Sequence, residues 1–238
     1  MRNGIILPSA LLAGLVLVAP RPAPGDDAKE PAKVEAVKRT EIGKNVYFET
    51  EGEQRRVVVK AYVCFREGQL EGLLCRKFTK EHEYILAADA DARHIHAALV
   101  AARGKPGSPV QFDPKFAPAH GSTIKVTLRY KQGDKLVTVP AQEWVLDAAA
   151  KKPLHQSWVF GGSRFLPDPD DKTRPDIYLA NQGDVICLCN METAMLDLPI
   201  RSPKGLDDRV YKAVTDKIPE KDTPVDVILE VVPEKKDK

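Results

Sequence analysis

The sequence predicts an α+β fold that is mostly antiparallel β-sheet with one main helix. Several segments alternate apolar and polar residues with a period of two, as strands with one buried face do. Turn-forming glycine, asparagine and aspartate residues separate these segments. A single alanine-rich segment has the pattern of a good helix. The 19 prolines and 15 glycines are also more typical of a loop-rich β protein than of a helical one.

The clearest strands are the segments with regular alternation. Thr123–Tyr130, Pro224–Val232 and Arg55–Phe65 each place their aliphatic side chains on one face. Their opposite faces carry most of the charged and polar residues, so each is expected to bury one side in a core. Three turns predict hairpin connections between strands: REGQ at 66–69, KQGDK at 131–135 and NQGD at 181–184.

The main helix is predicted at about residues 90–103. Its sequence is rich in alanine, Asp89 is placed to cap its start, and Gly104 is placed to end it. A weaker apolar stripe before Pro219 predicts a second helix near residues 206–217.

The N-terminus has the features of a secretory signal peptide. Arg2 precedes an apolar run from Ile5 to Val18, which is shorter than the roughly 20 residues that cross a bilayer. Small residues favour a cut before Asp26, so residues 1–25 are assigned to the signal. We therefore expect an exported protein, periplasmic or extracellular, without a transmembrane anchor after cleavage.

The remaining chain is divided by composition. Residues 26–44 are charged and predict a disordered tether, residues 45–233 predict a single domain, and residues 234–238 form a charged tail. Cleavage removes two arginines and no acids, which leaves 34 basic and 34 acidic residues. This balance argues against nucleic-acid binding, which depends on many phosphate contacts.

The histidines do not form a recognisable metal-binding pattern. On a helix, His94 and His96 point to opposite sides and cannot chelate one ion. His82 and Glu83 lack the second histidine of a zinc-protease helix, because Leu86 stands at that position. A composite metal site that combines His82 with His94 or His96 is kept as an alternative. We expect no metal and no cofactor.

The four cysteines, Cys64, Cys75, Cys187 and Cys189, are candidate disulfide partners in an exported protein. If 66–69 is a hairpin turn, Cys64 and Cys75 lie about 13 Å apart, further than the roughly 7 Å that a disulfide spans. A bond from either of them to Cys187 or Cys189 stays open, and buried free thiols are the alternative. The sequence contains no CxxC motif, so thioredoxin-like redox chemistry has no support.

Five stretches resemble the YdjY-type domain of exported bacterial proteins. They are LEGLLC (70–75), KEHEYILA (80–87), HAALVAARGKPGSPV (96–110), WVFGGSRF (158–165) and IPEKDTPVDVIL (218–229). The resemblance implies no particular activity or catalytic residue. It does place five candidate ligand-binding residues in shared motifs: Glu71, Lys80, His82, Glu83 and His96.

The sequence thus favours a non-catalytic module that binds an unknown protein or another component of the cell envelope. No complete catalytic constellation is present, so no catalytic residue is assigned. A metal- or small-ligand-binding protein, which could be an enzyme, is the first alternative and would use the glutamate, lysine and histidine cluster. A thiol or disulfide redox protein is the second.

Overall fold

Eight strands form a closed barrel. Each strand pairs with the next in a ring, and the pairing of β6 with β3 closes it. In ring order the strands are β3 (Gln54–Val63), β19 (Pro224–Val231), β9 (Thr123–Gln132), β13 (Trp158–Phe160), β17 (Leu196–Asp197), β16 (Ile186–Cys187), β5 (Gly72–Arg76) and β6 (Tyr84–Ala88).

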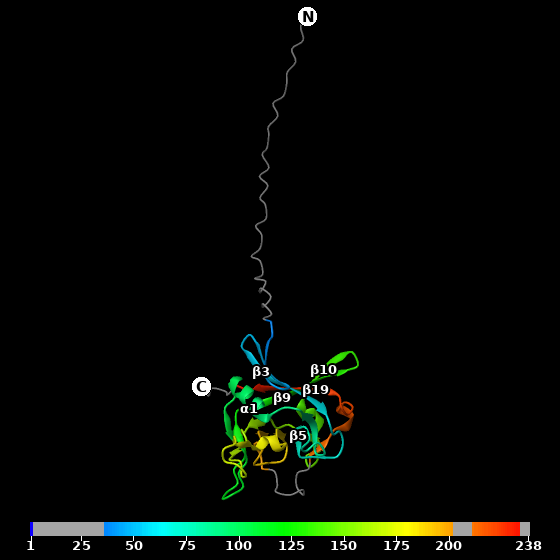
Figure 1. Cartoon of the computed structure of the whole chain (residues 1–238). Helices are drawn as coiled ribbons and strands as arrows, with labels where there is room; N and C mark the ends of the chain where they lie inside the picture. The colour runs from blue at the N-terminus through cyan, green and yellow to red at the C-terminus, as the bar shows by residue number, and fades with distance from the viewer. Residues whose placement is uncertain (2–35, 202–210, 234–238) are drawn as a thin grey trace. The chain divides into compact units, whose positions relative to one another are not determined.

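The structure is a computed structural model that describes Met1, residues 36–201 and residues 211–233 (Figure 1). Apart from Met1, the signal peptide assigned to residues 1–25 lies outside the described residues, as do the first part of the tether and the tail at 234–238. Among those described, no helix is long and apolar enough to cross a membrane.

The closed barrel corrects the predicted α+β fold with an antiparallel sheet. Two of the eight strand pairs, β5 with β6 and β16 with β17, are parallel. Alternation along a sequence shows which face of a strand is buried, but it does not show which edges meet. Strands as short as β16 and β17 also carry too few residues to show a period.

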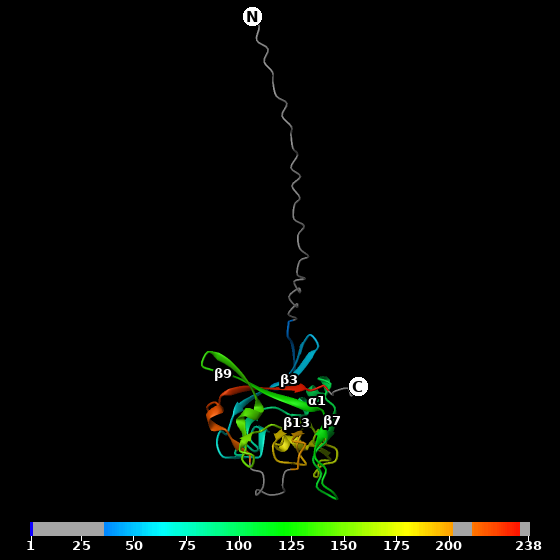
Figure 2. The same ribbon diagram turned by 180° about the vertical axis from the view of Figure 1, so that it is seen from behind.

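Three strands extend the barrel wall outward. Strands β1 (Lys38–Gly43) and β2 (Val46–Glu51) continue from β3, and β10 (Lys135–Pro140) forms a hairpin with β9. The hairpin confirms the turn predicted at 131–135. Both extensions project at the same end of the barrel in two opposite views (Figures 1 and 2). Strand β1 occupies residues that we assigned to the disordered tether, so the end of that assignment is wrong.

The other two predicted hairpins are wrong. After the turn at 66–69, β4 (Gln69–Leu70) pairs with β18 (Tyr211–Ala213), and β5 pairs with β6 and β16 instead of β3. The turn at 181–184 begins within a 3-10 helix, η2 (Leu179–Gln182), and the strands on either side of it, β15 (Ile177–Tyr178) and β16, pair with other strands. A glycine-containing turn shows that the chain changes direction, whereas the next pairing partner depends on the whole barrel.

The main helix is confirmed as α1 (Ala92–Ala101), but its cap is Asp91 and not Asp89. The Asp91 side chain accepts a hydrogen bond from the Arg93 backbone N–H. The prediction of a second helix is wrong for the described part of its segment. Residues 211–213 form β18, and residues 215–217 form the 3-10 helix η3 (Thr215–Lys217). The rest of that segment, 206–210, lies outside the described residues.

The main core fills the barrel and extends under α1. Ile95 and Leu99 of the helix join it, together with the large buried side chains of Trp144, Trp158 and Phe160. The remaining elements are short: β7 (Pro106–Ser108), β8 (His120–Gly121), η1 (Ala141–Trp144), β11 (Val145–Asp147), β12 (Lys152–Pro153), β14 (Phe165–Leu166) and β15 (Ile177–Tyr178).

Candidate functional site

A buried polar network is centred on Asp184, which lies between η2 and β16. Its carboxylate pairs with Lys80 Nζ at 2.9 Å and accepts hydrogen bonds from Tyr84 OH at 2.8 Å and from Thr193 Oγ1. The Asp184 side chain is only 5% exposed, so these donors replace the water that a carboxylate otherwise needs. Burial lowers the pKa of Lys80, but its bond to Asp184 outweighs that effect and raises the pKa overall.

Glu71 and Glu83 lie beside this network. The Glu71 backbone N–H donates to the Glu83 carbonyl at 3.0 Å, which brings the two side chains within hydrogen-bonding reach. Burial raises the pKa of Glu71, the Glu83 carboxylate raises it further, and the positive charge of Lys80 opposes the change. Glu71 therefore holds a proton more readily than an isolated glutamate does.

The two histidines proposed for this cluster differ in position. His82 stands at its rim, with Nε2 3.7 Å from the Glu83 carboxylate and a side chain that is 77% exposed. His96 lies elsewhere, under β15, with Nδ1 2.9 Å from Tyr178 OH and its ring edge against Phe160. Burial lowers the pKa of His96, so the neutral ring is favoured. The structure thus groups Glu71, Lys80 and Glu83, with His82 at the edge and His96 apart.

The histidine, cysteine and acidic side chains of the described residues are spread over separate places in the fold. No group of three or more histidine, cysteine, aspartate or glutamate residues among them is arranged to hold an ion. His94, the other histidine considered, is exposed on α1, and its ring covers Gly43 of β1.

The cysteines are free thiols, and three of them share one small core. Cys64, Cys75 and Cys187 are buried with Tyr84, whereas Cys189 is partly exposed. The neighbouring Cys75 thiol and burial both raise the pKa of Cys64, and burial raises that of Cys187. Such surroundings disfavour the thiolate that redox chemistry requires.

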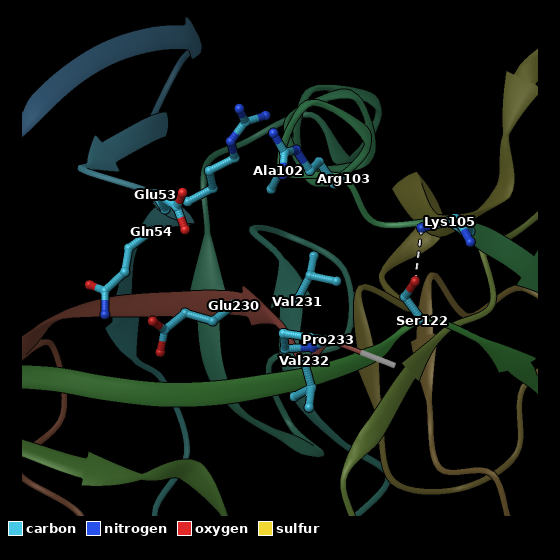
Figure 3. Close-up of a pocket in the computed structure, with 11 residues that line it drawn as sticks. Glu53, Gln54, Ala102, Arg103, Lys105, Ser122, Glu230, Val231, Val232 and Pro233 are labelled. Atoms are coloured by element: carbon cyan, nitrogen blue, oxygen red, sulfur yellow. Dashed lines mark hydrogen bonds between the residues drawn. The ribbon is translucent and has the colours of Figure 1, made fainter. Parts of the chain in front are cut away.

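A separate pocket of about 550 Å³ opens between the end of α1, the β2–β3 turn and the end of β19. In Figure 3, Glu53, Gln54 and Glu230 lie on one side of it, Lys105 and Ser122 lie on the other, and Val231, Val232 and Pro233 lie between them. Arg55, Ala102 and Arg103 complete the lining. The Lys105 backbone N–H donates to Ser122 Oγ at 2.9 Å, which ties the two chain segments together there.

The sequence pattern of the YdjY domain matches residues 48–230, which is most of the chain. The chain belongs to the YdjY domain family. The match spans seven of the eight barrel strands completely and all but the last residue of β19. No curated protein and no solved structure shows significant similarity to the chain.

Within this YdjY domain, sequence reasoning missed two buried aspartates. Asp184 was assigned to a turn, although it stands directly before an apolar strand. Asp197 is fully buried on β17, and burial raises its pKa to about 7, although it accepts backbone hydrogen bonds from Leu198 and Met191. The sequence signal was a lone acid within the apolar run AMLDLP.

Proposed function

We propose that this YdjY domain is an exported, non-catalytic binding module of the cell envelope, and that its pocket holds a ligand. The pocket carries this proposal, because its volume falls in the range of roughly 300–1,000 Å³ that small-molecule sites occupy. It also combines apolar and charged side chains, as ligand sites commonly do.

The chemistry around the pocket favours binding over catalysis. Its lining in the described chain contains no histidine and no cysteine. The groups whose pKa is raised most clearly by burial, such as Asp197, Tyr84 and Cys187, do not line the pocket. A general acid or base must reach the substrate directly or through one water, so this separation supports a role without a chemical step.

Native mass spectrometry of protein recovered from its own cell envelope tests the proposal. The wild type should carry a non-covalent adduct, and Val232→Trp, which fills the pocket, should lose it. Leu136→Trp is the matched control, since this residue is exposed on β10 and lies outside the pocket. An adduct that survives in Val232→Trp, or none in the wild type, would count against the pocket as the binding site.

A second candidate is ligand binding at the Glu71, Lys80 and Glu83 cluster, which is favoured by the convergence of these residues. The same mass measurement separates the two candidates. An adduct that Glu71→Gln abolishes and Val232→Trp retains would identify the cluster as the site.

A further inference from the structure

We infer that the pocket selects apolar ligands that bear a carboxylate, which Arg55 and Arg103 recognise. This inference rests on the proposed function, because it names the class of ligand that the same pocket would hold. Four features of the lining carry it: two guanidinium groups without a carboxylate partner among the described residues, a helix end whose carbonyls are occupied, one neutralised glutamate and an apolar strip.

The guanidinium groups of Arg55 and Arg103 differ from most arginines in the described chain. Neither forms an ion pair with a carboxylate of the described residues. Seven other arginines do form such pairs: Arg39, Arg56, Arg66, Arg93, Arg129, Arg164 and Arg174. Two guanidinium groups without a carboxylate partner among the described residues thus line one pocket, and their planar donors suit a carboxylate.

The C-terminus of α1 would normally disfavour an anion, because unpaired carbonyls give it a partial negative charge. Here the last carbonyls are already occupied. Those of Ala98, Leu99 and Val100 accept backbone hydrogen bonds from residues 102, 104 and 103. That of Ala101 lies 3.5 Å from an Arg55 nitrogen. The remaining field at the pocket is set mainly by the arginines.

The two glutamates of the lining weaken this positive charge only in part. Glu230 forms an ion pair with Lys125 at 3.2 Å, outside the pocket. Glu53 is exposed in the β2–β3 turn, where water screens its charge. With Arg55 and Arg103 against Glu53 alone, the lining keeps a positive balance suited to one anionic group.

The apolar part of the lining determines the rest of the ligand. Val231, Val232 and Pro233 form a continuous strip where β19 ends, and Ala102 faces them from the end of α1 (Figure 3). Burying such surface against an apolar ligand favours binding. A short aliphatic or aromatic body joined to a carboxylate would satisfy both parts of the pocket.

Nuclear magnetic resonance titration of the ¹⁵N-labelled protein with hexanoate and with hexanamide tests this inference. The two probes have the same apolar chain and differ in charge. Hexanoate should shift the Arg103, Val231 and Val232 amides saturably. Hexanamide should bind at least about fivefold more weakly. Arg55→Gln and Arg103→Gln should each weaken hexanoate binding about fivefold and leave hexanamide binding unchanged.

Arg76→Gln is the matched control, because Arg76 is exposed on β5 and lies outside the pocket. Equal binding of both probes, or unchanged hexanoate binding in both pocket variants, would overturn the inference of carboxylate selection and leave the pocket as a binding site. If neither probe shifts the pocket amides, the inference is also wrong. The adduct comparison with Val232→Trp then still decides the proposed function.

Discussion

At the scale of single residues, Asp184 organises the buried polar network. We expect Asp184→Asn to lower the free energy of unfolding by roughly 2–4 kcal/mol, because Lys80 would lose its charged partner in a half-buried position. Urea unfolding followed by fluorescence measures this loss. Glu143→Gln is the control, since Glu143 pairs with Lys217 on the surface, where a pair contributes about 0–1 kcal/mol. Equal losses in both variants would show that the bonds of Asp184 add no more stability than an exposed ion pair.

Asp197 should make stability depend on pH. Burial raises its pKa from the usual 3.8 to about 7, so the folded protein binds a proton that the unfolded chain releases between about pH 4 and 7. Stability from this group is therefore present at low pH and is lost as the pH rises through 7. Between pH 5 and 7 the loss is about 2 kcal/mol.

Asp197→Asn tests this dependence, because the amide resembles the protonated acid in shape and lacks its titration. Unfolding free energies of both proteins at pH 5, 6 and 7 give the comparison. The wild type should lose more stability than the variant over this range. Parallel pH profiles would mean that Asp197 titrates in its ordinary range.

The site could be predicted from sequence only in part, and the reason differs from residue to residue. Glu71, Lys80 and Glu83 lie within thirteen positions of one another, so a local motif brings them to notice. Asp184 is about a hundred positions further along, and only closure of the barrel brings it to Lys80. The pocket was missed because its lining comes from four distant segments, none with an unusual composition.

At the scale of secondary-structure elements, the start of α1 gives a direct comparison of two caps. Asp91 accepts hydrogen bonds from the Arg93 backbone and from Asn181 Nδ2. Asp91→Ala should therefore lower the unfolding free energy by about 1–2 kcal/mol. Asp89→Ala, at the cap that the sequence predicted, should change it much less than Asp91→Ala does, because Asp89 makes an exposed pair with Lys44. The reverse order in thermal unfolding would contradict the cap at Asp91.

Elements with strong local patterns were predictable, and elements defined by distant partners were not. Strands β9 and β19 carry long alternations and appear almost where the sequence placed them. The weak stripe at 206–217 misled, because Ala213, which belongs to it, lies in β18 and pairs with Val145 of β11. An apolar residue that faces a distant strand looks the same in sequence as one that faces along a helix.

At the scale of the whole molecule, closure of the barrel depends on the seam where β5, β6 and β16 meet. All five residues of β6 are buried, so this strand has no solvent face and lacks the alternation that marks the others. Its parallel neighbour β5 is also almost entirely buried. A continuous apolar run does not reveal its pairing partners, and for this reason the closed barrel could not be predicted.

Gly72 is the position where this seam can be tested. It pairs with Tyr84 across β5 and β6, and a Cβ built on it would come 1.8 Å from the Tyr84 ring. The ring cannot move freely, because its hydroxyl is bonded to Asp184 and lies 3.4 Å from Cys187 Sγ. Gly72→Ala should therefore disturb the seam and the polar network together.

We expect Gly72→Ala to lower the unfolding free energy by about 3 kcal/mol or more, as overpacking at a rigid core position does. Gly133→Ala is the control for replacing a glycine, because its φ of +59° is unfavourable for alanine but no atom lies within 4 Å of the new Cβ. Gly133→Ala should lower the unfolding free energy by about 1–2 kcal/mol. Urea unfolding followed by the fluorescence of the buried Trp144 and Trp158 measures both. A Gly72→Ala loss no larger than that of Gly133→Ala would show that β5 and β6 can separate, and that the barrel does not depend on tight packing at this seam.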